Sequence, residues 1–273
     1  MTIAGSGGVV IRPTGNTAPG FELLAGVSNV TIRNVTIDGS GGGVSYGIRI
    51  AGQNNVIDSV EVANVQNQGI ALYCADGSNH QHCGHGGNTL RNDHVHGSGS
   101  GGCHGTTAQD GFCHGVYIYS DDNVIDGGAF DHNNGWGIQS YGFNTTISNV
   151  FDHDNVSGGI TLPGSAHVSN SIFTGNNPSG QAAVIWAGSN SSFQDLTIKD
   201  NPSIGLFLPS GTSNVTVENV LSTGNKPNLR NDAGLSVSLD VAGARLVPGQ
   251  TTTAQVQPSL PPAPRNFRVI SLP

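Results

Sequence analysis

The chain has 273 residues, a formal net charge of -8 and a charged fraction of only 10%. Average proteins carry about 25% charged residues, and the 41 glycines of this chain are about twice the usual share. The negative charge argues against nucleic acid as a partner, and it disfavours a strongly polyanionic ligand unless a metal or a few arginines offset it locally. Because no apolar run approaches the roughly 20 residues of a membrane span, no membrane partner is expected.

The N-terminus enters strand-like sequence at once, with TIAGSGGVVIRP directly after Met1. It lacks the basic and apolar regions of a signal peptide, so we expect that an export signal has been removed or replaced and that the natural protein is longer. The first clear strands are residues 21–24 and 30–37. Short apolar runs separated by Asp, Asn and Gly clusters follow, which predicts strands joined by tight turns, and no window has a helical period.

Two strand patterns recur along the chain. A glycine-led strand is repeated as YGIRI at Tyr46, QGIAL at Gln68, HGVYI at His114, WGIQS at Trp136, GGITL at Gly158, AAVIW at Ala182 and IGLFL at Ile204. The second strand follows as NNVID, NTLRN, DNVID, NTTIS, AHVSN, SSFQD and SNVTV. The step between copies is about 22 residues, which is typical of stacked coils. The pattern predicts an all-β fold, a single-stranded right-handed parallel β-helix of about nine coils that forms one domain over residues 1–240.

Two ladders are expected in this β-helix. Coils stack at about 4.8 Å, so each backbone amide within a strand finds a partner in a neighbouring coil. The apolar positions of the glycine-led strands should form an inward column, namely Ile48, Ile70, Val116, Ile138, Ile160 and Leu206. The asparagines at the bends should form an amide ladder, namely Asn34, Asn92, Asn149, Asn170 and Asn219.

Two insertions interrupt the period, at residues 74–87 and 97–113, and each contains two cysteines. Loops are where such a fold places function. The first insertion leaves a glycine-led strand after Tyr73, and the second enters the next one at His114. We therefore expect the insertions to form walls on either side of one face.

The four cysteines permit three pairings, and proximity in sequence favours Cys74 with Cys83 and Cys103 with Cys113. Two such disulfide-bearing loops predict an oxidising compartment, and so a secreted or extracellular protein. A metal site is the alternative, although none of the usual short zinc spacings is present. It rests on a run of possible ligands, namely His80, His82, Cys83 and His85 within six positions, with His94, His96 and His104 following nearby. Free thiols are the third possibility.

The repeat ends near residue 240, and a Pro/Thr-rich segment follows. Proline-rich composition gives a stiff, extended chain, so residues 241–273 are expected to be a linker. The final PAPRNFRVISLP resembles the opening strand of a fibronectin type III module. This resemblance implies that the linker leads to a further module, here cut short.

The repeats between residues 20 and 238 resemble the right-handed parallel β-helix superfamily of the pectin-lyase type. The resemblance implies the fold more strongly than the function. Members are mostly polysaccharide lyases, uronan epimerases and glycoside hydrolases, with some phage tailspikes and adhesins. In them the substrate usually lies along the sheet that corresponds to the glycine-led strands, which implies a polysaccharide partner for this chain.

The outward face of that sheet is predicted to be aromatic, because side chains alternate along a strand. Tyrosine and tryptophan rings offer flat apolar surfaces together with hydrogen-bonding groups, which suit pyranose rings. The residues predicted to bind substrate are Tyr73, Trp136, Gln139 and Tyr141. The alternative is that these rings only cover the sheet or pack beneath the insertions.

No single enzyme family's motif is matched completely. The mannuronan epimerases carry Tyr-Gly-Phe-Asp-Pro-His on this strand, and YGIR at Tyr46 and WGIQ at Trp136 keep the frame but lose Asp-Pro-His. Polygalacturonase-like hydrolases carry an Asp-Asp pair followed by Gly-His-Gly and Arg-Ile-Lys. This chain has Asp121 and Asp122, but its GHG at Gly84 lies upstream and Arg-Ile-Lys is absent. The pectate-lyase Trp-Ile-Asp-His motif is absent too.

The remaining candidates suit β-elimination at a uronic acid, which needs a neutralised carboxylate, a base for the C5 proton and an acid for the leaving oxygen. Arg49 or a bound divalent cation such as calcium is predicted to neutralise the carboxylate, and no other cofactor is expected. His114 is predicted to abstract the proton, and Tyr117 or Tyr119 to donate one. A tyrosine base would instead need its pKa of about 10 lowered by a nearby cation.

An inverting glycoside hydrolase is the alternative, with Asp121 or Asp122 and another carboxylate such as Asp110 about 6.5 to 9.5 Å apart. The overall acidity suits this chemistry better than a lyase. The same pair also fits the turn that begins the DNVID strand. A non-catalytic glycan-binding or adhesive β-helix is the third class, since it needs the aromatic face but no perturbed acid or base. In every case we expect a secreted monomer.

Overall fold

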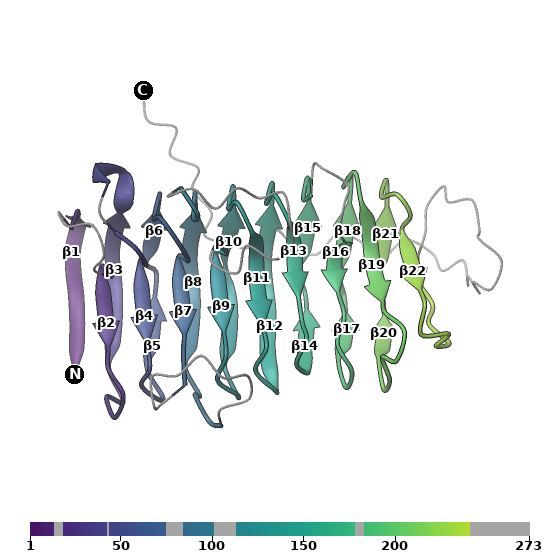
Figure 1. The fold of residues 1–273 in the computed structure, drawn as a ribbon, viewed down its shortest axis with the longest axis horizontal. Helices are drawn as coiled ribbons and strands as arrows, with labels where there is room; N and C mark the ends of the chain where they lie inside the picture. Colours follow the sequence, from purple (N-terminus) through teal and green to yellow (C-terminus); the bar gives the residue numbers. More distant parts are fainter. Residues whose placement is uncertain (14–18, 43, 75–83, 101–112, 178–182, 241–273) are drawn as a thin grey trace.

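The structure is a computed structural model that describes residues 1–13, 19–42, 44–74, 84–100, 113–177 and 183–240. These residues form a parallel β-helix whose coils stack along the long axis of the molecule (Figure 1). The one helical turn among them is the 3-10 helix η1 at Gly39–Gly41. Across the described ranges, no helix has the length and apolar character to cross a membrane. The predicted linker at residues 241–273 lies outside the described residues.

The glycine-led strands form the smaller of two parallel sheets. It has nine strands in chain order, namely β2 (Phe21–Leu23), β4 (Ile48–Ile50), β7 (Ile70–Leu72), β9 (Val116–Ile118), β11 (Trp136–Ser140), β13 (Gly158–Thr161), β16 (Ala183–Trp186), β19 (Ile204–Leu208) and β22 (Leu229–Asn231). One strand belongs to each coil, so the described residues confirm the prediction of about nine coils.

The larger sheet has thirteen strands within the described residues. They are β1 (Thr2–Ile11), β3 (Thr31–Asp38), β5 (Val56–Asp58), β6 (Glu61–Ala63), β8 (Thr89–His96), β10 (Val124–Asp131), β12 (Thr145–His153), β14 (Ala166–Ser169), β15 (Ile172–Thr174), β17 (Ser192–Gln194), β18 (Thr197–Lys199), β20 (Thr216–Glu218) and β21 (Leu221–Thr223). The long strands are bent, since β5 and β6 pair with the two halves of β8. A typical coil therefore contributes three strand segments.

Residues with a left-handed backbone conformation produce the bend in the larger sheet. Asn34, Asn92 and Asn149 have φ angles of 55°, 52° and 59°, a conformation that asparagine tolerates better than most other residues. Their side chains are exposed. The predicted bend asparagines, Asn170 and Asn219 included, therefore turn the chain at its surface. Of these, Asn149 and Asn219 donate to the carboxylates of Asp126 and Asp195 in the preceding coil, at 2.7 and 3.1 Å, so the predicted contact between coils is present at these two bends, with a carboxylate as the acceptor.

Other asparagines form two buried amide ladders. In the first, the backbone N–H of Asn55 donates to Oδ1 of Asn88, and that of Asn88 donates to Oδ1 of Asn123, both at 3.0 Å. In the second, each backbone N–H donates in the same way to the next asparagine, at 2.8 to 3.1 Å, along Asn133, Asn155, Asn176, Asn201 and Asn225. Each amide satisfies a buried N–H of the preceding coil, which would otherwise be costly.

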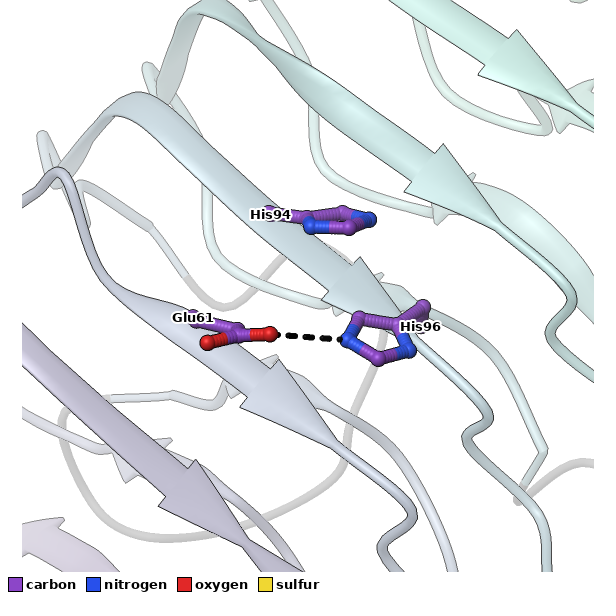
Figure 2. A group of neighbouring side chains, drawn as sticks. All are labelled: Glu61, His94 and His96. Atoms are coloured by element: carbon purple, nitrogen blue, oxygen red, sulfur yellow. Dashed lines mark hydrogen bonds and ion pairs between the residues drawn. The ribbon is translucent and has the colours of Figure 1, made fainter. Parts of the chain in front are cut away.

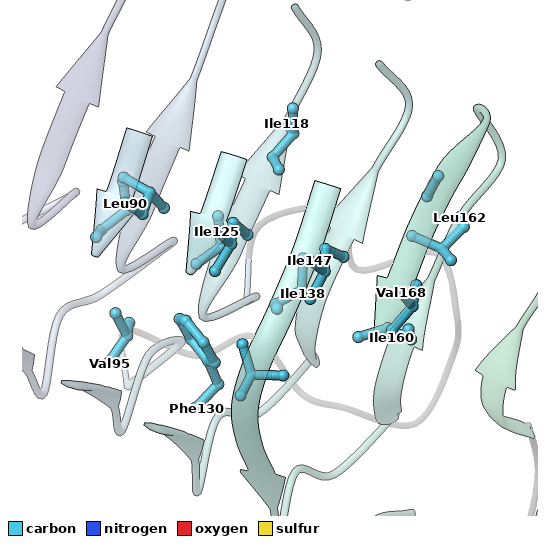
Figure 3. Close-up of a cluster of buried hydrophobic side chains, with 14 of the residues drawn as sticks. Leu90, Val95, Ile118, Ile125, Phe130, Ile138, Ile147, Ile160, Leu162 and Val168 are labelled. Atoms are coloured by element: carbon cyan, nitrogen blue, oxygen red, sulfur yellow. The ribbon is translucent and has the colours of Figure 1, made fainter. Parts of the chain in front are cut away.

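The interior of the β-helix is an apolar column (Figure 3). The predicted inward residues are confirmed, since Ile48, Ile70, Val116, Ile138, Ile160 and Leu206 are each 0% exposed. Ile70, Val116 and Ile138 are paired in register on β7, β9 and β11. Side chains of the larger sheet, among them Phe130, fill the space opposite. This core fixes which residues of each strand point outward.

Candidate functional site

Five tyrosines gather on the outer face of the smaller sheet, over β4, β7, β9 and β11. We call Tyr46, Tyr73, Tyr117, Tyr119 and Tyr141 the tyrosine cluster. Backbone hydrogen bonds at 2.7 to 2.8 Å place Tyr73, Tyr119 and Tyr141 in equivalent positions of three successive coils. The structure thus brings together the four tyrosines predicted from strand alternation and adds Tyr46, which directly precedes the glycine that leads its strand.

The rings of the cluster pack mainly against one another. Tyr73 stacks on Tyr119 with ring centroids 5.5 Å apart, and Tyr117 meets Tyr119 edge to face at 4.6 Å. Tyr73, Tyr117 and Tyr119 are only 7%, 5% and 8% exposed. Their ring faces are therefore not open platforms for sugar stacking, and the geometry favours the packing alternative for these three. The partly exposed members are Tyr46 and Tyr141.

The hydroxyl groups of the cluster form short polar contacts. The Tyr119 hydroxyl donates to that of Tyr117 at 2.9 Å, and Gln139 Nε2 donates to the Tyr141 hydroxyl at 3.1 Å. Burial, reinforced by neighbouring tyrosines, raises the pKa of Tyr73 and of Tyr117 well above the ordinary value. Burial likewise raises the pKa of Tyr119. These phenols stay protonated, so they can donate protons but are poor bases.

Arg49 lies beside the cluster and brings a positive charge to this face. Its guanidinium carbon is 4.8 Å from the centroid of the Tyr73 ring. Its Nη1 also forms an ion pair with Glu22 Oε1 at 2.7 Å, because Glu22 on β2 is the register partner of Arg49. Glu22 was not among the predicted site residues, although its outward position one coil earlier was readable from the repeat. A substrate carboxylate at Arg49 would have to compete with it.

His114, just before β9, is buried and is not exposed to a substrate. It is 4% exposed, its ring stacks on Tyr117 at 5.2 Å, and its Nδ1 accepts the backbone N–H of Trp136 at 3.0 Å. Burial lowers the pKa of His114 to about 3, so the ring is neutral and carries its hydrogen on Nε2. This geometry disfavours the predicted base role. Trp136 is itself 3% exposed, which disfavours sugar stacking there.

Asp121 and Asp122 lie in the turn after β9. Asp121 Oδ1 accepts the backbone N–H of Phe143 at 2.7 Å. Asp122 has a φ of 60°, and its Oδ2 lies 2.8 Å from His85 Nδ1. The hydrogen bonds from His85 and Asn144 lower the pKa of Asp122. The contacts fit the turn interpretation, since an inverting general acid needs a raised pKa. Asp110, its proposed partner, lies outside the described residues.

The insertions lie where the sequence places them, the first between β7 and β8 and the second between β8 and β9. Cys74 and Cys113 are 1% and 0% exposed. Their predicted partners, Cys83 and Cys103, lie outside the described residues, as do His80 and His82. The disulfide pairing, its metal alternative and the two walls therefore stay predictions.

Comparison with known proteins supports the architecture. A family model described as a right handed beta helix region matches residues 114–243. The A-module of mannuronan C-5 epimerase AlgE4 from Azotobacter vinelandii is similar with a TM-score of 0.55 and 17% identity, over 93% of this chain and 83% of that one. The pectate lyase Pel9A is similar with a TM-score of 0.55 and 14% identity, over 91% of this chain and 68% of that one. Curated proteins gave no match.

These comparisons agree with the structure that the fold is a right-handed parallel β-helix, as predicted from the repeats. At such low sequence identity the likeness concerns the fold alone. What the face of the smaller sheet does has to be argued from its own side chains.

Proposed function

We propose that the protein is a carbohydrate-active enzyme that binds an acidic polysaccharide along the tyrosine cluster and acts by abstraction of the C5 proton, as a lyase or an epimerase. The observation that carries the proposal is a proton-donating hydroxyl pair, Tyr119 to Tyr117, on the same face as the cation Arg49. The similar structures are enzymes named for mannuronan and pectate, both polymers of uronic acids, and this supports the substrate class.

Tyr117 is the best candidate for the acid. Its oxygen accepts the Tyr119 proton at 2.9 Å, and its own proton is shared with Tyr141. A leaving glycosidic oxygen that replaced Tyr141 as the acceptor could take that proton. The raised pKa of Tyr117 keeps that proton in place until the leaving oxygen becomes basic. The hydrogen bond from the Tyr119 hydroxyl would then stabilise the Tyr117 phenolate as it forms.

Arg49 is the candidate for the uronate carboxylate. A guanidinium can bind a carboxylate through two parallel hydrogen bonds, and this neutralises the charge that would otherwise oppose removal of the C5 proton. The ion pair with Glu22 is about one-third exposed on both sides, so the expected contribution of that pair is small and exchange with a substrate carboxylate is feasible. A divalent cation such as calcium remains the alternative neutralising group.

The candidate for the base is His114. Within the described part of this face, Glu22 is paired with Arg49, and Nδ1 of His114 accepts the Trp136 N–H. Proton abstraction by His114 would require that bond to break when substrate binds. The low pKa of His114 at least keeps the ring unprotonated, as a base must be.

Hydrolysis is the weaker candidate, because Asp121 and Asp122 are committed to the turn and the pKa of Asp122 is lowered. The product screen described below also tests a non-catalytic binding role. We further propose that the protein acts as a secreted monomer, which the predicted cysteine pairing would favour.

The test is a product screen with polygalacturonate, alginate and neutral glycans. β-Elimination leaves an unsaturated sugar that absorbs in the ultraviolet, and epimerisation inverts C5 without cleavage, which proton NMR detects. Either result on an acidic polymer supports the proposal. Reducing ends without ultraviolet absorbance would show a hydrolase, and binding without turnover on any glycan would show an adhesin.

A further inference from the structure

A second group of polar side chains lies on the outer face of the larger sheet. His94 and His96 occupy outward positions of β8 on either side of the buried Val95. Strand register places Glu61 of β6 beside His94, and it places Asp131 of β10 beside His96. We call the set the histidine ladder, namely Glu61, His94, His96, Asp131, His132 and His153.

Three members of the ladder converge on one point of the surface (Figure 2). His96 Nε2 lies 3.2 Å from Glu61 Oε1, and the rings of His94 and His96 stack with centroids 4.4 Å apart. One ligand atom from each of the three residues lies within 4.8 Å of the others. Their side chains are 44%, 43% and 26% exposed for Glu61, His94 and His96, so an ion could reach them from solvent.

The surroundings orient these side chains for coordination. His94 Nε2 lies 2.7 Å from Asp131 Oδ1; the carboxylate can only accept, so Nε2 carries the hydrogen and Nδ1 keeps its lone pair. The Thr36 hydroxyl donates to Glu61 Oε2 at 3.0 Å, so Oε1, which lies 3.2 Å from His96 Nε2, is the oxygen that would turn to an ion. A carboxylate behind a metal-binding histidine and a hydrogen bond to a ligating carboxylate are the usual outer partners of metal ligands.

We propose that Glu61, His94 and His96 bind one divalent metal ion, zinc or an ion with similar ligand preferences. Two imidazoles and a carboxylate are a ligand set that zinc and related ions favour, whereas calcium prefers oxygen ligands only. Zinc–ligand bonds of about 2.0 to 2.2 Å bring ligand atoms to roughly 3.5 Å from one another. The ligand atoms now lie within 4.8 Å of one another, and modest rotations of these exposed side chains would bring them to the shorter separation. Three protein ligands leave a position for water.

The neighbouring group of Asp131, His132 and His153 is less suitable. Its potential ligand atoms also lie within 4.8 Å of one another. However, both oxygens of Asp131 are already engaged, Oδ1 with His94 at 2.7 Å and Oδ2 with His132 at 2.6 Å. Asp131 therefore supports the first site and is not its competitor.

The test is titration of the chelator-treated, redialysed protein with zinc chloride, followed by isothermal calorimetry and by metal analysis after gel filtration. We expect one equivalent of zinc at this site. His94→Ala and His96→Ala should weaken binding by more than about 100-fold, and Asp131→Asn by about 10 to 100-fold, as is usual for an outer partner. The matched control is His167→Ala, since His167 is an exposed histidine of the same sheet bonded only to Ser192 among the described residues; it should bind zinc like the parent protein.

Circular dichroism of every variant separates a lost site from a lost fold. The proposal is overturned if the folded parent protein retains no zinc, or if zinc binding survives in the His94→Ala/His96→Ala double variant. It is also overturned if His132→Ala and His153→Ala abolish binding while the double variant retains it, because the ion would then belong to the neighbouring group. The outcome is independent of any glycan activity.

Discussion

The tyrosine cluster and the histidine ladder lie on the outer faces of different sheets over the same part of the stack, yet they differ in exposure. Tyr117 of the cluster is 5% exposed, whereas the side chains of His94 and His132 in the ladder are 43% and 66% exposed. Both groups occupy positions that alternate with buried core residues. An outward position therefore does not decide solvent contact, because large rings in adjacent coils can bury one another while imidazoles paired with carboxylates remain open.

This difference separates the chemistry of the two regions. Burial in the cluster keeps phenols protonated and makes them donors. Exposure in the ladder leaves imidazoles accessible to ions from solvent. The predictions below test whether the regions are as independent as their contacts indicate, and they run from the largest expected effect to the smallest.

Phe130→Ala should destabilise the protein most, by about 3 to 5 kcal/mol, because it leaves a cavity in the shared core. Phe130 is 0% exposed and is paired in register with Val95 and Asp152, directly beneath the ladder. Urea unfolding measures the change. Tyr141→Phe, which removes only a hydroxyl at the margin of the cluster, is the comparison and should lose far less. A loss below about 1 kcal/mol in Phe130→Ala would contradict this account of the core.

Tyr117→Phe should lower turnover on an acidic polysaccharide by about 100-fold while binding changes little, because it removes the proton donor and keeps the ring. Tyr119→Phe should have a smaller effect of the same kind. Initial rates of ultraviolet absorbance give the first quantity and calorimetry the second. Trp186→Phe is the control, since Trp186 is 36% exposed on β16 of the same sheet, away from the cluster. Unchanged turnover in both tyrosine variants would mean that the acid has been misassigned.

The inward carboxyl of Asp93, on the strand that carries His94 and His96, should make stability fall as pH rises. Burial raises the pKa of Asp93 to about 8 despite the hydrogen bond from the Val60 N–H. In the unfolded chain the carboxyl ionises near its ordinary pKa of 3.8, so between pH 3.8 and pH 8 folding takes up a proton. Stability is therefore greatest at the acid end and is lost toward pH 8.

Asp93→Asn removes this ionisation and tests the sign of the effect. The variant should gain stability relative to the parent protein progressively from about pH 4 to pH 8. Denaturant unfolding at several pH values gives the difference between the two proteins, so that other titrating groups common to both cancel. A difference that does not depend on pH would show that Asp93 stays ionised in the folded protein.

Glu22→Gln should have the smallest effect, a rise of about two- to five-fold in affinity for acidic glycans, since it frees Arg49 from a partly exposed ion pair. Arg49→Gln should lower that affinity, and neither change should alter zinc binding at the ladder. Calorimetry with polygalacturonate oligomers measures both. If Glu22→Gln weakens binding instead, the carboxylate itself contacts the glycan.

The repeat made most of the fold predictable, because apolar spacing specifies which side chains point inward. The repeat could not show which asparagines turn the chain and which form the buried ladders. Asn54 and Asn55 are neighbours in NNVID, yet the first is exposed with a φ of 54° and the second is a buried member of the first ladder. Two different roles require the same residue type in adjacent positions, so composition alone cannot separate them.

The two surface regions differ in the same respect. The tyrosines were predictable because they repeat in the glycine-led strands, but their burial was not, since it depends on how rings in separate coils meet sideways. The histidine ladder carries no short motif, because Glu61, His94 and Asp131 come from three coils whose spacing is altered by the insertions. Only the strand register brings those residues together.

The buried amide ladders also have a mechanical consequence. Each amide bonds to the adjacent coil, so every coil is stabilised mainly by its two immediate neighbours. A terminal coil has a neighbour on one side only, and it should therefore fray first in hydrogen exchange. A broken link at Asn155, in the middle of the second ladder, would divide the stack into two blocks that melt separately, whereas a broken link at Asn225 would release only the last coils.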